Sequence, residues 1–129
     1  MIPGRLSPLQ LHILSALSGM RPRWTLSGGG ALVGFHTRHR ETRDLDLFWQ
    51  RTRELGTVAP DALRLLEAER LEVTVLQTHP AFARLQVRQA DQETVVDLVA
   101  DPVPLAEAPE ERPVGTAHIL VVPIRPSVP

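Results

Sequence analysis

Three aspartates lie in apolar segments that are predicted to form strands. Asp44 and Asp46 are two residues apart at the start of one segment, and Asp97 lies inside another. Because residues i and i+2 of a strand point to the same face, Asp44 and Asp46 project together, about 6–7 Å apart at Cα. Two such carboxylates repel each other unless a cation lies between them, and Mg²⁺ prefers oxygen ligands of this kind. The pattern indicates a magnesium site, and the alternative is an exposed strand start with two solvated acids.

Asp97 is flanked by valine and leucine. An isolated charge is seldom buried without a partner or a metal. If its strand neighbours the strand of Asp44 and Asp46, we expect the three carboxylates to form one metal cluster. The alternative places Asp97 on the solvent-facing side of an edge strand. Asp101 is the weaker candidate for a ligand, because it falls in a predicted loop.

A glycine-rich turn, Ser27-Gly28-Gly29-Gly30, joins a predicted strand to a short predicted helix. Glycine lets the backbone approach a ligand closely, and a helix that starts just after the turn presents unpaired N–H groups to an anion. A phosphate is the natural ligand of such a turn. The alternative is a flexible turn without a ligand.

Five arginines flank the Asp44–Asp46 pair within sixteen residues: Arg38, Arg40, Arg43, Arg51 and Arg53. A basic rim of this kind suits a nucleotide or an RNA acceptor, and the alternative is a solvated loop balanced by nearby acids. All 14 basic residues are arginine, so no lysine can act as a base or a Schiff-base amine. The net charge of -1 provides no global positive field for nucleic acid.

Composition predicts one globular domain. The chain has 129 residues, of which 43% are hydrophobic and 22% charged, and this balance argues against disorder. Cysteine is absent, which excludes a disulfide framework, a thiolate zinc site and a thiol nucleophile. Apolar runs are too short to span a membrane, and the N-terminus has no continuous apolar stretch typical of a secretory signal. We therefore expect a cytoplasmic protein without a membrane partner.

Periodicity predicts a mixed α/β or α+β sheet with helices packed on it. Ser7, Pro8 and Gln10 have the pattern of a capping box at the start of a helix that ends before Pro22. The other predicted helices are a short one at 31–36 and an amphipathic one at 61–70. Strands are predicted at 24–26, 45–49, 71–76, 81–87, 94–99 and 117–122, and a loop at 101–113. We expect the domain to cover residues 1–122, followed by a proline-rich tail at 123–129.

The glycine turn, the arginine-containing loop and the Asp-x-Asp strand together resemble the AbiEii/AbiGii-type nucleotidyltransferases. These belong to the polymerase-β-like superfamily and include toxins of type IV toxin–antitoxin systems. The resemblance covers residues 24–99, and more loosely the chain as far as Val122. A third acid on a later strand completes the family pattern, and Asp97 fits that place. The implied fold is the polymerase-β-like nucleotidyltransferase core, a mixed sheet flanked by helices.

The resemblance implies a two-ion Mg²⁺ site in which Asp44, Asp46 and Asp97 are the ligands and the catalytic acids. Asp97 would also activate the hydroxyl of the acceptor. Ser27 and the turn Gly28, Gly29 and Gly30 would bind the phosphates of an NTP, and Arg40 would neutralise phosphate charge. The reaction would move NMP from an NTP, ATP or GTP included, to an RNA such as tRNA or to a protein, with pyrophosphate leaving.

Two features of the sequence depart from the family pattern. Superfamily members follow the paired glycines with serine or threonine, where this chain has Gly30, and larger AbiEii-type proteins continue into a helical region with a lysine and acid motif. The alternative is therefore a catalytically incomplete binding or interaction module, short or truncated. Such a module would need a helical C-terminal region or a partner protein, and an antitoxin is the partner that the resemblance implies.

Overall fold

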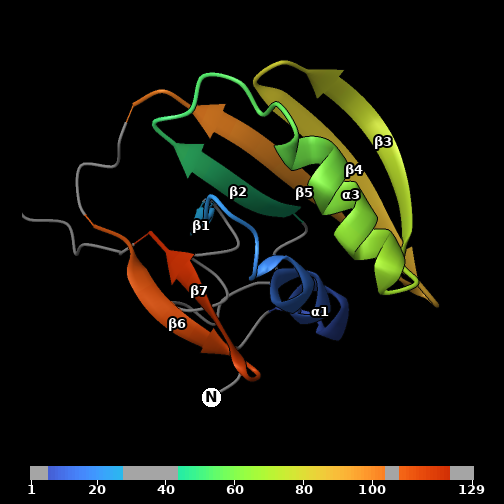
Figure 1. Ribbon diagram of the computed structural model, residues 1–129. Coiled ribbons are helices and arrows are strands. Elements are labelled where there is room, and N and C mark those ends of the chain that lie inside the picture. Colours follow the sequence, from blue (N-terminus) through green and yellow to red (C-terminus); the bar gives the residue numbers. More distant parts are fainter. Residues whose placement is uncertain (1–5, 28–43, 104–107, 123–129) are drawn as a thin grey trace, which may run out of the picture.

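A seven-stranded mixed sheet with two helices on one face forms the part of the chain that the computed structural model describes, residues 6–27, 44–103 and 108–122 (Figure 1). The strand order is β3-β4-β5-β2-β1-β7-β6. The predicted mixed sheet flanked by helices is thereby confirmed. The helices are α1 (Pro8–Leu17) and α3 (Val58–Ala68), and the strands are β1 (Thr25–Ser27), β2 (Asp44–Gln50), β3 (Glu72–His79), β4 (Phe82–Gln89), β5 (Gln92–Asp101), β6 (Glu110–Val114) and β7 (Ala117–Val121).

Helix α1 begins at the predicted capping box. The Gln10 amide donates to Ser7 Oγ over 3.1 Å, and the Ser7 amide donates to Gln10 Oε1 over 2.9 Å, which satisfies two N–H groups of the first turn. The helix ends at Leu17, earlier than the predicted end before Pro22. The Trp24 indole donates to the Leu17 carbonyl over 2.8 Å and so satisfies a backbone acceptor of the last turn.

Helix α3 begins three residues before the predicted start at Asp61. Pro60 lies inside its first turn, where a proline is tolerated because the backbone N–H has no partner within the helix. Val58, Ala62 and Leu66 are buried four residues apart and form the stripe that packs on the sheet. Arg70 has a positive φ of 63°, which ends the helical path.

The last four residues of the predicted loop at 101–113 belong to a strand. Glu110–Val114 forms β6, which pairs with β7 at the edge of the sheet. Its acidic and proline-rich composition suggested a loop, but an edge strand tolerates proline because one side needs no hydrogen-bond donors. The hairpin turns at Gly115, whose φ of 62° favours glycine.

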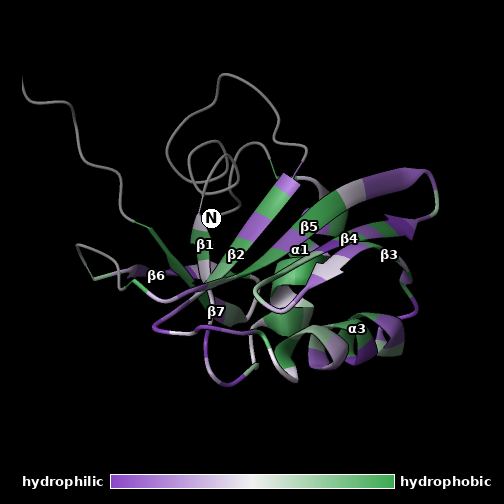
Figure 2. Cartoon of the chain, turned by 90° about the horizontal axis from the view of Figure 1, so that it is seen from above, coloured by the Kyte–Doolittle hydropathy of each residue, from purple (hydrophilic) through white to green (hydrophobic). Residues whose placement is uncertain are grey.

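Alternate residues of the central strands point to opposite faces. Leu45, Leu47 and Trp49 are buried on the face that α1 and α3 cover, and both tryptophans of the chain lie in the core. Asp44, Asp46 and the other even-numbered residues of β2 lie on the opposite face, called the open face below, and β2 alternates in hydropathy along its length (Figure 2). Neither helix of the described residues has the length and apolar character needed to cross a bilayer.

Candidate functional site

One row of residues runs across four neighbouring strands on the open face. Strand β5 runs parallel to β2, and Asp97 is the Cα partner of Asp46. On the other side of β5 the partner of Asp97 is Arg84 of β4, and on the other side of β2 the partner of Asp46 is Ser27 of β1. Partners in register share a face of the sheet. These four residues, Ser27, Asp46, Asp97 and Arg84, are called the acid row.

The pairing of β2 with β5 brings together the three aspartates that the sequence singled out. Asp44, the first residue of β2, lies two residues from Asp46 and therefore on the same face. The alternative position for Asp97, on an edge strand, is wrong, because β5 is flanked by β4 and β2. The three carboxylates come from two central strands of the sheet, whose backbones hold each other in register.

Asp97 is buried, with a relative exposure of 6%. Arg84 Nε donates to Oδ1 of Asp97 over 2.8 Å, and Nη2 donates to Oδ2 over 3.1 Å. This two-point hold gives the buried carboxylate the partner that it requires. The hydrogen bond and the charge of Asp97 in turn raise the pKa of Arg84 above its ordinary value.

The pKa of Asp46 is raised above its ordinary value, first because burial removes water from its carboxylate. The negative charges of Asp97 and Asp44 and a hydrogen bond with Asp97 raise it further, whereas the charge of Arg84 lowers it. Three carboxylates therefore crowd one another, and Arg84 compensates only part of their charge. A divalent cation would relieve this repulsion, so the donor set suits Mg²⁺ in charge and in chemistry.

Asp44, Asp46 and Asp97 do not form a ready-made metal cage. Within residues 6–27, 44–103 and 108–122, no group of three or more histidine or acidic side chains is arranged to hold a metal ion. Both oxygens of Asp97 bond to Arg84, but a carboxylate offers about four acceptor sites, so these bonds do not exhaust its capacity. Asp44 also takes part in an interaction of its own. The assignment of the three aspartates as metal ligands stays a prediction.

Several residues of the predicted phosphate site lie outside the described part of the chain. These are Gly28, Gly29, Gly30 and Arg40. Ser27 is described, and it lies half-buried at the end of β1 opposite Asp46. Ser27 and Asp44 are the described residues on either side of the predicted phosphate segment. Ser27 lies opposite Asp46, and Asp44 lies two residues before Asp46 on the same face, so both ends of the segment lie next to the acids.

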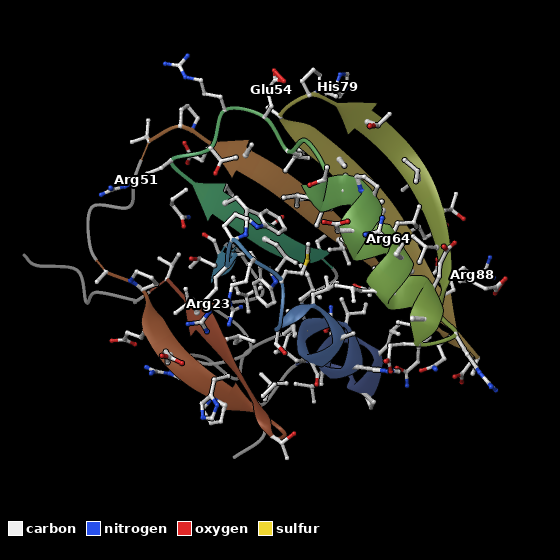
Figure 3. The ribbon with its side chains drawn as sticks, viewed as in Figure 1. Arg23, Arg51, Glu54, Arg64, His79 and Arg88 are labelled. Carbon is white, nitrogen blue, oxygen red and sulfur yellow. The ribbon has the colours of Figure 1, made fainter. Side chains whose placement is uncertain are left out.

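Arg51 and Arg53 do not flank the acid row. They follow the last residue of β2, about 16 Å or more along the chain from Asp46, and both are exposed. Figure 3 labels Arg51. Arg51 and Arg53 therefore do not contribute to the predicted basic rim, because the length of β2 separates them from its acidic start. The other three arginines of that prediction, Arg38, Arg40 and Arg43, lie outside the described residues. Asp101 is the last residue of β5 rather than part of a loop, and its carboxylate accepts from the Val103 amide over 3.0 Å.

Sequence reasoning missed Arg84. Its position opposite Asp97 follows from the hairpin between β4 and β5, in which Gln89 pairs with Gln92 across Ala90 and Asp91. A two-residue turn at that place would have implied the pairing of Arg84 with Asp97. The signal was weak, because Ala90 adopts a φ of 55° where glycine or asparagine is the usual residue.

Residues 12–124 match the family model described as Nucleotidyl transferase AbiEii toxin, Type IV TA system. The chain belongs to this family. The match begins inside α1 and ends just after β7, so it covers the whole sheet and the acid row. The resemblance that the glycine turn and the three aspartates suggested is thereby confirmed. The sequence matches no curated protein.

Three solved structures have the same fold. MenT4, a nucleotidyltransferase toxin from Mycobacterium tuberculosis, is 22% identical with a TM-score of 0.60, over 89% of this chain and 47% of its own. A nucleotidyltransferase-like protein from Helicobacter pylori and JHP933 from the same species are 17% and 18% identical, each with a TM-score of 0.55. They cover 87% and 89% of this chain and 51% and 53% of their own. This AbiEii family member thus spans about half the length of the solved structures that it matches.

Proposed function

We propose that this chain carries the catalytic core of an Mg²⁺-dependent nucleotidyltransferase, which moves NMP from an NTP to a hydroxyl of an RNA or protein acceptor. The observation that carries the proposal is the register of β2 with β5, which places Asp46 beside Asp97 on the open face of a nucleotidyltransferase fold. Membership of the AbiEii toxin family supports the reaction class. The same membership supports a role as the toxin of a toxin–antitoxin pair, with an antitoxin as partner.

The candidate residues would have two roles, metal binding and phosphate binding. Asp44, Asp46 and Asp97 would hold the metal ions, which supply charge stabilisation for the triphosphate and the leaving pyrophosphate. Gly28–Gly30, with Ser27 before them, would receive the phosphates through backbone N–H groups, and Arg40 would add a guanidinium.

The oxygen of the acceptor hydroxyl attacks the α-phosphorus, the bond from this phosphorus to the bridging oxygen breaks, and pyrophosphate leaves with that bonding pair. The hydroxyl proton would pass to the carboxylate of Asp97, the acid to which the family resemblance gives the activation of the acceptor hydroxyl.

Calorimetric titration with each NTP, with and without Mg²⁺, tests the proposal. We expect Mg²⁺-dependent binding that Asp46→Asn abolishes. Asp101→Asn is the matched control, because it makes the same change on the same strand face, about 13 Å along β5 from Asp97. Asparagine also keeps the carbonyl oxygen that accepts from Val103. Binding that Asp46→Asn leaves unchanged would contradict the metal assignment.

A second candidate is a nucleotidyltransferase-like module that binds nucleotide but completes its site with another protein. Two observations favour it: Arg84 bonds to both oxygens of Asp97, and the described residues hold no group of three metal ligands. This module would bind an NTP without transferring NMP to RNA or protein from a cell extract. Transfer of radiolabel from α-labelled NTP by the chain alone would exclude this candidate.

A further inference from the structure

Arg84 has a more specific task than neutralising a buried acid. We propose that Arg84 is a positioning residue of the nucleotide site, which fixes the carboxylate of Asp97 and binds a phosphate of the incoming NTP with its remaining donors. The proposal rests on the proposed function and adds a residue to it. It requires that Arg84 be held rigidly, that it have more donors than Asp97 uses, and that its charge favour the nucleotide.

The guanidinium of Arg84 is held from two sides. The two hydrogen bonds to Asp97, of 2.8 and 3.1 Å, set its plane, because a guanidinium and a carboxylate meet edge to edge in this arrangement. The ring of Phe82, two residues earlier on the same strand face, lies 5.5 Å from the guanidinium carbon. An arginine held in this way loses little further freedom on binding a ligand.

The donors of Arg84 exceed what Asp97 uses. A guanidinium has five N–H donors, and the two bonds to Asp97 take one at Nε and one at Nη2. The side chain is 39% exposed, on the same open face as Asp46, so a ligand above the acid row can reach it. A phosphate accepts from a planar pair of N–H groups as readily as a carboxylate does.

The charge of Arg84 should have opposite effects on the binding of a metal ion and of an NTP at the open face. A free metal ion is attracted by Asp44, Asp46 and Asp97 and repelled by Arg84. An NTP is repelled by the same carboxylates and attracted by Arg84. A residue that merely supports the fold would change the affinity for both ligands in the same direction, so the two signs separate the roles.

The experiment measures both ligands on the same variants. Binding of Mn²⁺ alone is followed by electron paramagnetic resonance, and binding of a non-hydrolysable NTP analogue in saturating Mg²⁺ by calorimetry. For Arg84→Gln we expect Mn²⁺ affinity to rise about three- to tenfold at low ionic strength, because a positive charge beside the ligands is gone. We expect affinity for the analogue to fall about tenfold, because charge-assisted hydrogen bonds to phosphate are lost.

Two further variants separate charge from geometry. Arg84→Lys keeps the charge without the two-point hold, so Mn²⁺ affinity should stay within about twofold of the wild type while analogue affinity falls between the wild type and Arg84→Gln. Arg88→Gln is the control, because Arg88 lies on the same strand face, about 13 Å along β4, opposite Glu93 (Figure 3). It should change neither affinity by more than about twofold.

The outcomes distinguish this proposal from the proposed function. If Arg84→Gln shifts both affinities in the same direction, or shifts neither, Arg84 has no phosphate-binding role, even though the wild type binds NTP and Asp46→Asn does not. If the wild type binds neither Mn²⁺ nor the analogue, the proposed function fails and the role of Arg84 fails with it. Circular dichroism of each variant shows whether a loss of binding reflects a loss of fold.

Discussion

The two faces of β2 and β5 are built from alternate residues of the same strands, yet one face buries apolar side chains and the other carries neighbouring carboxylates. On the covered face Leu45, Leu47 and Leu98 are fully buried against the helices, and each neighbour adds to the same apolar core. On the open face Asp46 and Asp97 lie side by side, and the charge of Asp97 makes the charged form of Asp46 less favourable. The covered face therefore stabilises the fold. On the open face the carboxylates repel one another, and a bound cation can relieve this repulsion.

The largest effect that we expect is on the open face. Asp46→Asn removes one of two adjacent carboxylates and should reduce Mg²⁺-dependent NTP binding below the detection limit of calorimetry. The same variant should unfold at an equal or higher temperature than the wild type in Mg²⁺-free buffer, because the repulsion is relieved. A variant that loses binding together with thermal stability would show that Asp46 supports the fold instead.

A substitution on the covered face should instead lower stability and leave NTP binding in place. Leu47 is adjacent to Asp46 and fully buried. Leu47→Ala should lower the free energy of unfolding by about 2–5 kcal/mol, because the change leaves a cavity in the core. Urea denaturation measures this loss. Below the unfolding transition, Mg²⁺-dependent NTP binding should persist, and its complete loss in a folded Leu47→Ala protein would mean that the two faces are not independent.

The burial of Asp46, together with the repulsion from its neighbouring carboxylates, also predicts a smaller dependence of stability on pH. Because the folded pKa of Asp46 is raised above its value of 3.8, the folded state holds this proton more tightly than the unfolded state does. This contribution to stability is fully present below pH 3.8 and is lost as the pH rises through the raised pKa. The stability of the wild type relative to Asp46→Asn should therefore fall across this window in Mg²⁺-free buffer, as thermal unfolding at successive pH values would measure. A constant difference would rule out the raised pKa of Asp46.

The smallest effect that we expect is at the predicted phosphate turn. Gly30→Ser adds the hydroxyl that superfamily members place after the paired glycines, and it should tighten NTP binding about threefold through one additional hydrogen bond. Calorimetry with Mg²⁺ measures the change. No change in affinity would count against a phosphate-binding role for this turn, whereas the result for Asp46→Asn would be unaffected.

Local sequence patterns predicted an element well where interactions between residues close in sequence determine it. The capping box at Ser7 lies where its sequence placed it, because the two hydrogen bonds join residues of a single turn. The edge strand β6 was missed, since its proline and acids are typical of loops and only pairing with β7 orders it. The predicted helix starts at Asp61, whereas α3 starts at Val58 and contains Pro60 in its first turn.

The sequence by itself determined that Asp44 and Asp46 share a face, because the two-residue period of a strand is a property of the local backbone. It also placed Asp97 in a strand, since valine and leucine surround it. Only the tertiary structure decided that β5 lies parallel to β2 and that Arg84 holds Asp97. Pairing between strands far apart in sequence depends on how the whole sheet packs on α1 and α3, and no local pattern contains that choice.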